Sequence, residues 1–354
     1  MATVLDVAKR AGVSPMTVSR VVNGSGPVSP KLRTRVEKAL KETGYVPNTV
    51  ARNLRTKRTD TLGLVMPDIT NPFFTHVVRG MEVAARDAGL LLLLTNTDQR
   101  PDEELRIVAL LLQRQVDGML AVPAGTCADT ARLCREAEVP LVIVDRRPEM
   151  PGVDVVRADA EGGAYQLGKL LASLGHQHLA VISGPEYVPT AVDRAAGFIK
   201  AVDEEGLPAP IVVFGDFSLE SGHDMTLELM KQEPRPTAIF AANNFLAIGT
   251  QHALQELGLR IPEDVALVGL DDLPPDMVTF PFLTVAAQPA EEIGREAVEL
   301  LLRRIKDPDG GPEEILLPTE LTVRRSSGDP LLVEDDVGRV AQVGPARDGR
   351  VPCP

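Results

Sequence analysis

Polar and aromatic side chains follow several short apolar runs of this 354-residue chain, and they are the residues best placed to bind a small molecule. Four of them, Asp68, Asn71, Phe73 and Phe74, follow the run at 62–66, and Asp145 follows the run at 141–144. The second half of the chain contributes a further set: Arg194, Phe217, Asn243, Asn244 and Asp271, with Gln288 at a later crossover. Ligands of open α/β sheets bind beyond the carboxyl ends of the strands, so these residues are candidates for one site.

The chemistry of this set suits a sugar-like ligand. Arginine and aspartate hold vicinal hydroxyls through charge-assisted hydrogen bonds, and an aromatic ring covers the apolar face of a sugar. Two plainer interpretations stay open, because Phe73 and Phe74 could be core residues and Asp145 or Asp271 could cap helices.

Enzyme motifs are absent from the sequence. There is no G-x-S-x-G, no G-x-G-x-x-G and no G-x-x-x-x-G-K-[ST], and no glycine loop precedes Gly168-Lys169. The histidines lack the neighbouring cysteines or carboxylates of a zinc site, and His176-x-His178 is interpreted as a surface pair; they are His76, His176, His178, His223 and His252. We expect no enzyme, no cofactor and no metal.

The distribution of charge separates the N-terminus from the rest. The net charge is −13, yet residues 1–60 hold 12 Lys/Arg against 4 Asp/Glu, and the remainder holds 25 against 46. A basic module on an acidic body indicates binding to DNA phosphates through the first 60 residues only.

Short helices are predicted in this basic segment. The first places Leu5, Ala8 and Ala11 on one face and ends at Gly12. Ser14 caps a second helix at 15–22, which begins at Pro15 and buries Val18, Val21 and Val22. Ser29-Pro30 repeats the cap and proline, and a third helix with the stripe Leu32, Val36 and Leu40 ends at Gly44. Two short helices joined by a glycine turn indicate a helix-turn-helix.

Residues 47–58 are polar and basic, with little apolar surface beyond Val50, Ala51 and Leu54. So short a segment does not hold a helix alone in water, so we interpret it as a linker that folds on a partner.

From Thr61 onward, apolar runs alternate with amphipathic helices, which predicts open parallel sheets with helices on both faces. The helices include 73–88, 103–115, 191–204 and 290–306. The runs are too many for one sheet, so we expect two subdomains that divide near residue 160. Buried strands are predicted at 62–66, 90–95, 118–122, 141–144, 179–182, 211–214, 238–241 and 265–270.

Three cysteines cannot form a disulfide framework, and the N-terminus lacks the apolar run of a signal peptide. No apolar stretch is long enough to cross a bilayer. A cytoplasmic protein without membrane contact is expected.

Residues 3–24, TVLDVAKRAGVSPMTVSRVVNG, resemble the N-terminal signature of the LacI/GalR family of transcriptional regulators. The segments Tyr45-x-Pro47-Asn48 and Ala51-Arg52-x-Leu54 are similar to the hinge of that family. The body continues the resemblance to about residue 325, in Arg194-x-x-Gly197-Phe198 and in residues 268–272, VGLDD, among others. A periplasmic binding protein would share the body but lack residues 1–58.

The resemblance implies a small all-α helix-turn-helix domain followed by an α/β sensor of two subdomains like those of periplasmic binding proteins. The boundaries implied are 1–46 for the DNA-binding domain, 47–60 for the hinge helix, 61–325 for the sensor and 326–354 for a disordered tail. The sensor divides into 61–158 plus 289–318 and 159–288 plus 319–325.

The resemblance also implies how the protein binds DNA. The helix at 15–22 would read bases in the major groove from Pro15, Met16 and Arg20, while the hinge leucine, Leu54, would wedge into the minor groove. Pairing of two hinges implies a homodimer on a pseudo-palindromic operator. The full set of expected DNA contacts is Thr3, Ser14, Pro15, Met16, Thr17, Ser19, Arg20, Asn23, Asn48, Ala51, Leu54 and Arg55.

For the effector, the resemblance implies that Arg194, Asn243 and Asp271 hydrogen-bond sugar hydroxyls or purine edges, and that Phe217 stacks on the ligand. The loop at 186–190 lacks the arginine of purine repressors, so a sugar is preferred to a purine. The family commonly has Asn-Asp where this chain has Asn243-Asn244, which removes a charge near the cleft. Arg146, Arg147 and Arg157 leave open a phosphorylated or acidic sugar. Effector control of a repressor through cleft closure is the function expected.

Overall fold

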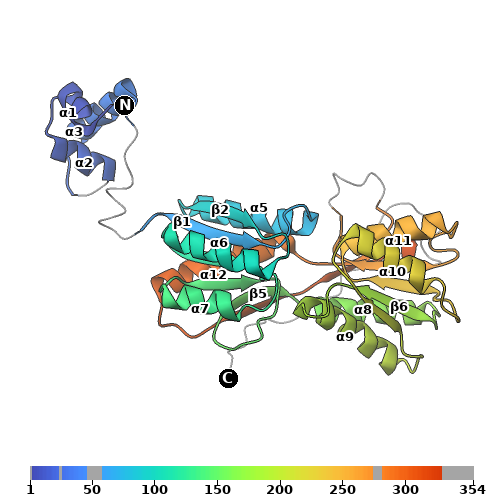
Figure 1. The fold of residues 1–354 in the computed structure, drawn as a ribbon. Helices are drawn as coiled ribbons and strands as arrows, with labels where there is room; N and C mark the ends of the chain where they lie inside the picture. The colour runs from blue at the N-terminus through green and yellow to red at the C-terminus, as the bar shows by residue number, and fades with distance from the viewer. Residues whose placement is uncertain (1, 24–25, 46–57, 274–280, 329–354) are drawn as a thin grey trace. The chain divides into compact units, whose positions relative to one another are not determined.

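The computed structural model describes residues 2–23, 26–45, 58–273 and 281–328 (Figure 1). The chain forms two compact units, Met1–Thr59 and Asp60–Pro354. No helix in the described ranges is both long enough and apolar enough to cross a membrane.

The first unit contains three helices, α1 (Val4–Ala11), α2 (Pro15–Asn23) and α3 (Pro30–Thr43). A capping box starts α1, in which Thr3 accepts from the backbone of Asp6 and the Asp6 carboxylate accepts from the backbone of Thr3. Left-handed glycines end α1 and α3, at Gly12 and Gly44. The core of this unit is small: Val7, Ala8, Ala11, Val18, Val21, Val36 and Ala39.

Two details of these helices differ from prediction. Leu5 is 67% exposed, because the buried face of α1 follows Val7, Ala8 and Ala11 with Val4 packed beside them. Ser29 does occupy the cap of α3, but its side chain makes no capping hydrogen bond. Ser14 does cap α2, accepting from the backbone N–H of Thr17 at 3.2 Å.

The second unit contains two six-stranded sheets (Figure 1). The first has the order β11-β5-β4-β3-β1-β2 and the second the order β12-β10-β9-β8-β6-β7. Every described pairing is parallel except β10 with β12. The strands are β1 (Thr61–Met66), β2 (Leu91–Asn96), β3 (Gly118–Ala121), β4 (Leu141–Val144), β5 (Asp154–Ala158), β6 (Leu179–Ser183), β7 (Ile211–Phe214), β8 (Ala238–Ala241), β9 (Ala266–Leu270), β10 (Thr284–Ala287), β11 (Glu314–Leu317) and β12 (Glu320–Thr322).

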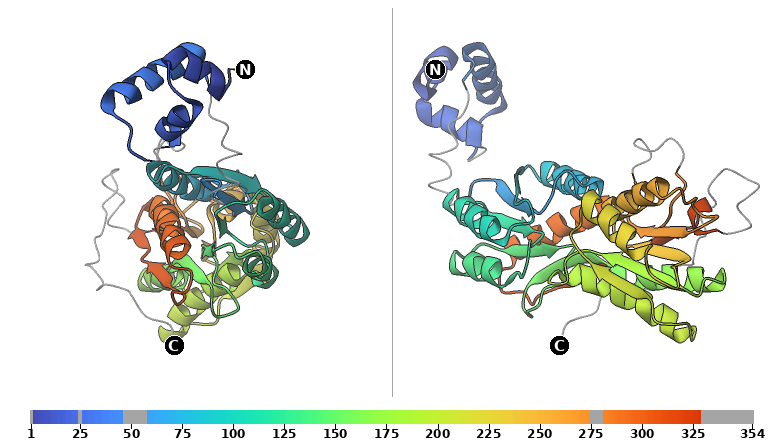
Figure 2. Two further views of the ribbon diagram at one scale, coloured as in Figure 1. Left: turned by 90° about the vertical axis from the view of Figure 1, so that its left-hand side faces the viewer. Right: turned by 45° about the vertical axis from the view of Figure 1, so that its right-hand side comes forward.

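Helices cover both faces of each sheet (Figure 2). One face of the first sheet carries α5 (Pro72–Asp87) and α12 (Ala290–Lys306), and the other carries α6 (Pro101–Gln113) and α7 (Ala128–Glu136). On the second sheet, α8 (Ala160–Ser173) packs with α9 (Pro189–Glu204), and α10 (Leu219–Leu229) packs with α11 (Asn244–Glu256). The chain crosses between the sheets after β5, β10 and β11, so each sheet is the centre of one subdomain.

The strand prediction was wrong in two respects. The run at 90–95 was expected to be buried, but β2 lies at a sheet edge and leaves Leu91, Leu93 and Leu94 exposed. The strands β5, β10, β11 and β12 were missed, because they are short and carry polar residues such as the buried Asp154, which pairs with Arg304 at 2.7 Å.

The predicted start of the disordered tail, residue 326, is too early in the chain. Arg325–Ser327 form a 3₁₀ turn in which Ser326 and Ser327 are fully buried. The Ser326 hydroxyl donates to the carbonyl of Leu267 and fixes this turn against β9. The rest of the predicted tail, 329–354, lies outside the described residues.

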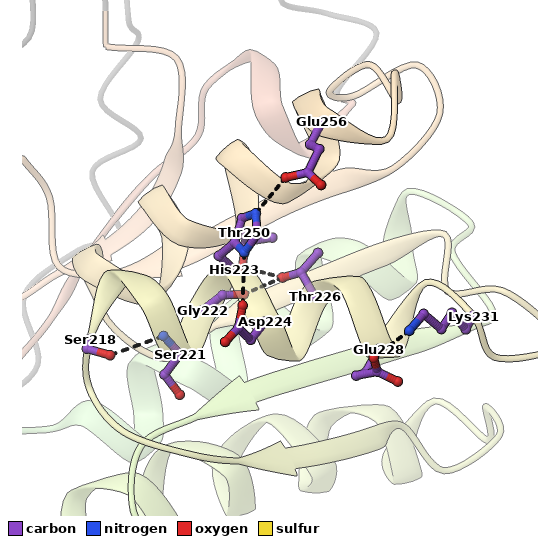
Figure 3. A network of polar contacts seen from close by, with 10 residues as sticks. All are labelled: Ser218, Ser221, Gly222, His223, Asp224, Thr226, Glu228, Lys231, Thr250 and Glu256. Carbon is purple, nitrogen blue, oxygen red and sulfur yellow. Dashed lines mark hydrogen bonds and ion pairs between the residues drawn. The ribbon is translucent and has the colours of Figure 1, made fainter.

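Close packing of α10 on α11 fixes the ends of both helices near the pocket described below (Figure 3). A Cβ at Gly249 would lie 2.1 Å from the carbonyl of Leu219, so the two backbones approach without room for a side chain. Thr226 and Thr250 are hydrogen-bonded at 3.1 Å within this contact. His223 lies between the carboxylates of Asp224 and Glu256, which raise its pKa.

Candidate functional site

The second helix of the first unit presents a polar, exposed beginning. Pro15, Met16 and Arg20 are exposed, Met16 by 65%. Thr17 was expected to be exposed too, but it is half-buried and its hydroxyl contacts that of Ser14 at 2.9 Å. Thr3 and Ser14 are exposed, and Ser19 is half-buried. Apart from Thr3, which caps α1, and Ser14, which caps α2, these residues lie on one helix, as contact with base edges in a major groove requires.

Part of the predicted DNA contact set cannot be placed. Asn48, Ala51, Leu54 and Arg55, together with most of the expected hinge helix at 47–60, lie outside the described residues. Asn23 ends α2, and its side chain is also outside the description.

A pocket lies between the two subdomains of the second unit, at the carboxyl ends of the central strands. It contains about 420 Å³ of empty space, including the part that opens to solvent. The pocket brings together all the predicted effector residues except Asn244 and Gln288; its lining is Asp68, Asn71, Phe73, Phe74, Gln99, Asp145, Arg146, Thr190, Arg194, Phe217, Asn243 and Asp271.

Each subdomain contributes one aspartate to the pocket from an equivalent place. Asp145 follows β4 and Asp271 follows β9, and both have left-handed backbones, with φ of 66° and 72°. Each backbone N–H donates to the neighbouring strand, Asp145 to Val156 at 2.9 Å and Asp271 to Ala286 at 3.2 Å. Aspartate tolerates this conformation better than most residues, and such outliers gather at functional sites.

Three buried polar atoms of the pocket have no hydrogen-bond partner within the described part of the chain. They are Oδ1 of Asp145, Oγ1 of Thr190 and Nε of Arg194. Each belongs to a residue that is at most 8% exposed. A buried polar group without a partner is unfavourable by about 1–3 kcal/mol, so the pocket contains an acceptor, a hydroxyl and a donor that a bound molecule can satisfy.

Arg194 and Phe217 form one wall of the pocket. The guanidinium of Arg194 donates from Nη1 to the carbonyl of Ala242 at 2.7 Å, and its Cζ lies 5.8 Å from the centre of the Phe217 ring. The ring lies directly on Gly184, where a Cβ would be only 2.3 Å from it. Glycine after β6 is therefore what leaves room for the aromatic ring at this position.

The electrostatics of the two aspartates reflect burial beside arginine. Burial raises the pKa of Asp271 to about 6, against the opposing effects of Arg194 and a hydrogen bond from Gln288. Burial also raises the pKa of Asp145, with Arg194 and Arg146 opposing it. Both carboxylates thus bind protons more readily than ordinary aspartates do.

Two predicted ligand residues have other principal partners. Gln288 lies outside the pocket lining and donates to Oδ1 of Asp271 at 2.5 Å. It therefore orients that carboxylate from outside the pocket. Asn243 caps α11, accepting from the backbone N–H of Leu246 at 2.8 Å. Asn71 caps α5 and bonds to Asn244, as considered further below.

Sequence reasoning missed Gln99 and Thr190 as pocket residues. Gln99 follows β2 and Thr190 lies in the first turn of α9, so the rule that ligands bind beyond strand ends could have included them. Of the three arginines considered for an acidic ligand, only Arg146 lines the pocket. Arg147 pairs with Asp193 and Arg157 with Glu314, at 2.9 and 2.6 Å. Among the described residues, no cluster of His, Cys, Asp or Glu could hold a metal ion.

Comparisons with known proteins agree with this architecture. The family of bacterial regulatory proteins of the lacI type matches residues 3–48, and the family of periplasmic binding proteins and sugar-binding domains of the LacI family matches residues 59–325. The chain is 33% identical over 332 residues to the HTH-type transcriptional repressor PurR of Photobacterium profundum, covering 93% of this chain and 99% of that protein.

Two solved structures extend the similarity to three dimensions. A lac repressor dimer bound to operator and the anti-inducer ONPF has a TM-score of 0.83 and 30% identity, covering 92% of this chain and 99% of the other. The complex of the transcriptional regulator CelR with cellobiose has a TM-score of 0.71 and 35% identity, covering 92% and 100%. The chain therefore belongs to the LacI family and is a DNA-binding transcriptional repressor with a ligand-binding domain, not an enzyme.

Proposed function

We propose that this repressor binds a pseudo-palindromic operator as a homodimer and is controlled by a small neutral polyhydroxy ligand, such as a sugar, in the pocket between the subdomains. Ligand binding would shift the population between two spacings of the subdomains, and that spacing would decide whether the hinge segments pair on DNA. The ligand can act in this way only through unequal affinity for the two states.

The observation that carries the proposal is the convergence of unpartnered buried atoms on the pocket. Oδ1 of Asp145 accepts, Nε of Arg194 donates, and Oγ1 of Thr190 can do either. A sugar hydroxyl also donates and accepts, so hydroxyls are the groups that match all three kinds of atom. The Phe217 ring supplies the apolar surface that covers one face of a sugar ring.

The charges of the pocket favour a neutral ligand over a phosphorylated or acidic one. Asp68, Asp145 and Asp271 line it together with only two arginines. Arg146 already has protein partners, since it donates to the carbonyl of Pro123 and lies near the buried Glu104. An anionic group would therefore approach more carboxylates than guanidinium groups.

A purine base is the second candidate ligand, because Phe73, Phe74 and Phe217 give the pocket three aromatic rings. Phe73 and Phe74 meet edge to face at 5.2 Å, so they form one rigid apolar surface. A ligand panel separates the two candidates.

The apolar edge strand β2 supports the dimer. Leu91, Leu93 and Leu94 are 64%, 38% and 40% exposed at the edge of the first sheet, with Leu91 and Leu93 on the same face of the strand. Exposed apolar patches and open sheet edges are typical of interfaces. Leu93→Asp should raise the dimer dissociation constant at least about tenfold in sedimentation experiments; an unchanged constant would place the interface elsewhere.

For DNA, the proposal assigns base contacts to Pro15, Met16 and Arg20 of α2 and phosphate contacts to Thr3, Ser14, Thr17 and Ser19. The roles of Asn23 and of the hinge residues Asn48, Ala51, Leu54 and Arg55 stay as predicted from sequence.

The test is thermal unfolding of the full chain against neutral sugars, sugar phosphates, nucleosides and purine bases. A ligand that binds only the folded protein at a hundred times its dissociation constant stabilises it by about 2.7 kcal/mol. We expect a neutral sugar to raise the midpoint and its phosphate ester to be weaker. A response to purine bases alone would replace the sugar proposal, and a response to phosphorylated sugars alone would contradict the neutral pocket.

A further inference from the structure

Two side-chain contacts join the subdomains without any ligand, and the first is a pair of asparagines. Asn71 begins α5 in the first subdomain and Asn244 begins α11 in the second. The Nδ2 of Asn71 donates to Oδ1 of Asn244 at 3.1 Å, and the Nδ2 of Asn244 donates to Oδ1 of Asn71 at 3.0 Å. The two residues are only 6% and 1% exposed, so this reciprocal pair is shielded from water.

The backbone fixes the orientation of both amides. Oδ1 of Asn71 also accepts from the N–H of Phe73 at 2.9 Å, and Oδ1 of Asn244 accepts from the N–H of Phe245 at 2.7 Å. An amide turned by 180° would present its NH₂ group to a backbone donor, so only one arrangement is compatible with both helices. Each oxygen has two donors in the closed arrangement, and none of them comes from a ligand.

The second contact is an ion pair on another element. Arg147 follows β4 in the first subdomain, and Asp193 lies on α9 in the second. Two hydrogen bonds join them, from Nη2 at 2.9 Å and from Nε at 3.2 Å. The Arg147 side chain is 51% exposed, so salt screens this contact, whereas the buried amide pair carries no net charge.

An amide at position 244 does what a carboxylate cannot. An aspartate there could still accept from Asn71 and from the backbone of Phe245, but it could not donate to Oδ1 of Asn71. One of the two hydrogen bonds between the subdomains would be lost, and two oxygens would face each other in a buried place. The closed arrangement thus depends on the residue type at 244 and not only on its size.

We propose that the Asn71–Asn244 pair is a latch that holds the two subdomains in the closed arrangement, with Arg147–Asp193 as a second, salt-sensitive contact. The latch makes the closed state the predominant one before any ligand arrives. A ligand then changes the spacing of the subdomains only if it binds the open arrangement better, because a ligand that prefers the already populated closed arrangement shifts almost nothing. This consequence for control rests on the proposed function, whereas the latch itself does not.

The test measures the distance between subdomains in the full chain without effector. Spin labels at Arg132→Cys on α7 and Glu228→Cys on α10, in a Cys353→Ser background, report this distance by pulsed electron resonance. Labelled chain is mixed with an excess of unlabelled chain so that distances within one protomer dominate. We expect one narrow distribution, and a longer or broader one after Asn244→Ala or Asn71→Ala.

The controls separate a latch from a general loss of structure. Asn96→Ala removes an amide that bonds only within the first subdomain, accepting from the backbone N–H of Ile69 and donating to Asp98, and should leave the distribution narrow. The double variant should match either single variant, since both remove the same pair. Asn244→Asp keeps the size of the side chain and its bond to Phe245, so it should fold and give an intermediate distribution.

A broad distribution in the unsubstituted chain would overturn the latch, as would distributions that Asn71→Ala and Asn244→Asp leave unchanged. Because no effector is used, neither result depends on whether the ligand is a sugar. Failure of the latch and failure of the proposed function are therefore distinguishable.

Discussion

The two subdomains have the same strand order, yet they surround the pocket with different chemistry. Asp145 after β4 and Asp271 after β9 occupy equivalent positions with left-handed backbones. The residue that follows the neighbouring strand differs, however. Asp159 follows β5 and caps α8 by accepting from Gly162, whereas Gln288 follows β10 and donates to Asp271. One carboxylate therefore has a neutral donor, while Oδ1 of the other is left for a ligand.

The two subdomains thus place residues at equivalent positions around the pocket, and the residue types at those positions determine which groups each subdomain offers to a ligand. The first subdomain contributes an open acceptor. The second contributes an oriented carboxylate, Arg194 and the Phe217 ring. Arg194 faces both carboxylates, so it links the two halves of the site electrostatically.

The largest effect should follow from removing that link. Arg194→Ala deprives the ligand of a charged donor and leaves two buried carboxylates with less compensation. Charged hydrogen bonds contribute about 1.5–3 kcal/mol each, so effector affinity should fall roughly a hundredfold or more by calorimetry. Arg157→Ala is the matched control, since Arg157 pairs with Glu314 away from the pocket. Equal losses in the two variants would mean that Arg194 acts only through stability.

The pH dependence of stability should separate the two aspartates. The pKa of Asp271 is about 6 in the folded chain against 3.8 ordinarily, so the folded state binds a proton more tightly than the unfolded state does. Its stabilising effect is complete below pH 4 and is lost as the pH rises through 6. The loss is about 3 kcal/mol, from 1.36 kcal/mol for each pKa unit.

Denaturant unfolding between pH 4 and 7 measures this loss. In Asp271→Asn, the part of the decline that Asp271 causes should disappear. Asp145→Asn should also reduce it, because burial raises the pKa of Asp145 as well. A decline that neither variant alters would show that these carboxylates do not titrate as their surroundings imply.

Substitution of Gly184 should have a smaller effect on effector affinity. Gly184 follows β6 in the second subdomain, where the first subdomain has Pro67 after β1. In Gly184→Ala, the new methyl group would meet the Phe217 ring and displace it. Loss of one aromatic contact is about 0.5–1.5 kcal/mol, so effector affinity should fall about tenfold with little change in the free energy of unfolding. Gly175→Ala tests a glycine with open space around it but a φ of 88°, so it controls for backbone strain alone. Unaltered binding in Gly184→Ala would remove Phe217 from the site.

The smallest effect should come from Gln288, which acts on the ligand through Asp271. Gln288→Ala removes one hydrogen bond of about 1 kcal/mol and should weaken effector binding about fivefold. Since this bond lowers the pKa of Asp271, the variant should also raise that pKa, as seen by NMR of the carboxyl carbon. A purely structural residue would change stability and leave the Asp271 titration where it is.

Many helices and strands of the two subdomains, and the residues at the ends of their strands, could be predicted from the sequence, because capping residues, prolines and apolar runs indicate them locally. Cap residues and prolines marked the helix starts at Pro15 and Pro30, and buried apolar runs marked β1, β4, β8 and β9. Strand ends then placed Asp145 and Asp271 in one pocket. The exposure of β2 could not be predicted, since its leucines resemble those of a buried strand and only the sheet order puts them at an edge.

The partners of polar side chains were also beyond sequence reasoning. Asn71 and Gln288 were correctly placed near the cleft, but their bonds to Asn244 and Asp271 depend on the fold across long separations in the chain. Thr190 follows β6, so its place near the pocket could have been predicted, but the lack of a partner for its hydroxyl could not. Its significance appears only when its hydroxyl is seen buried without a partner.

Operator binding by the full chain, with and without ligand, tests the central claim most directly. An operator is selected from random duplexes, and its affinity is measured by fluorescence anisotropy in the presence of the sugar that raises the unfolding midpoint. The account predicts that this sugar changes operator affinity at least about tenfold in the unsubstituted chain and not in Arg194→Ala, which still binds the operator. Equal operator affinity with and without a sugar that binds the pocket would contradict it.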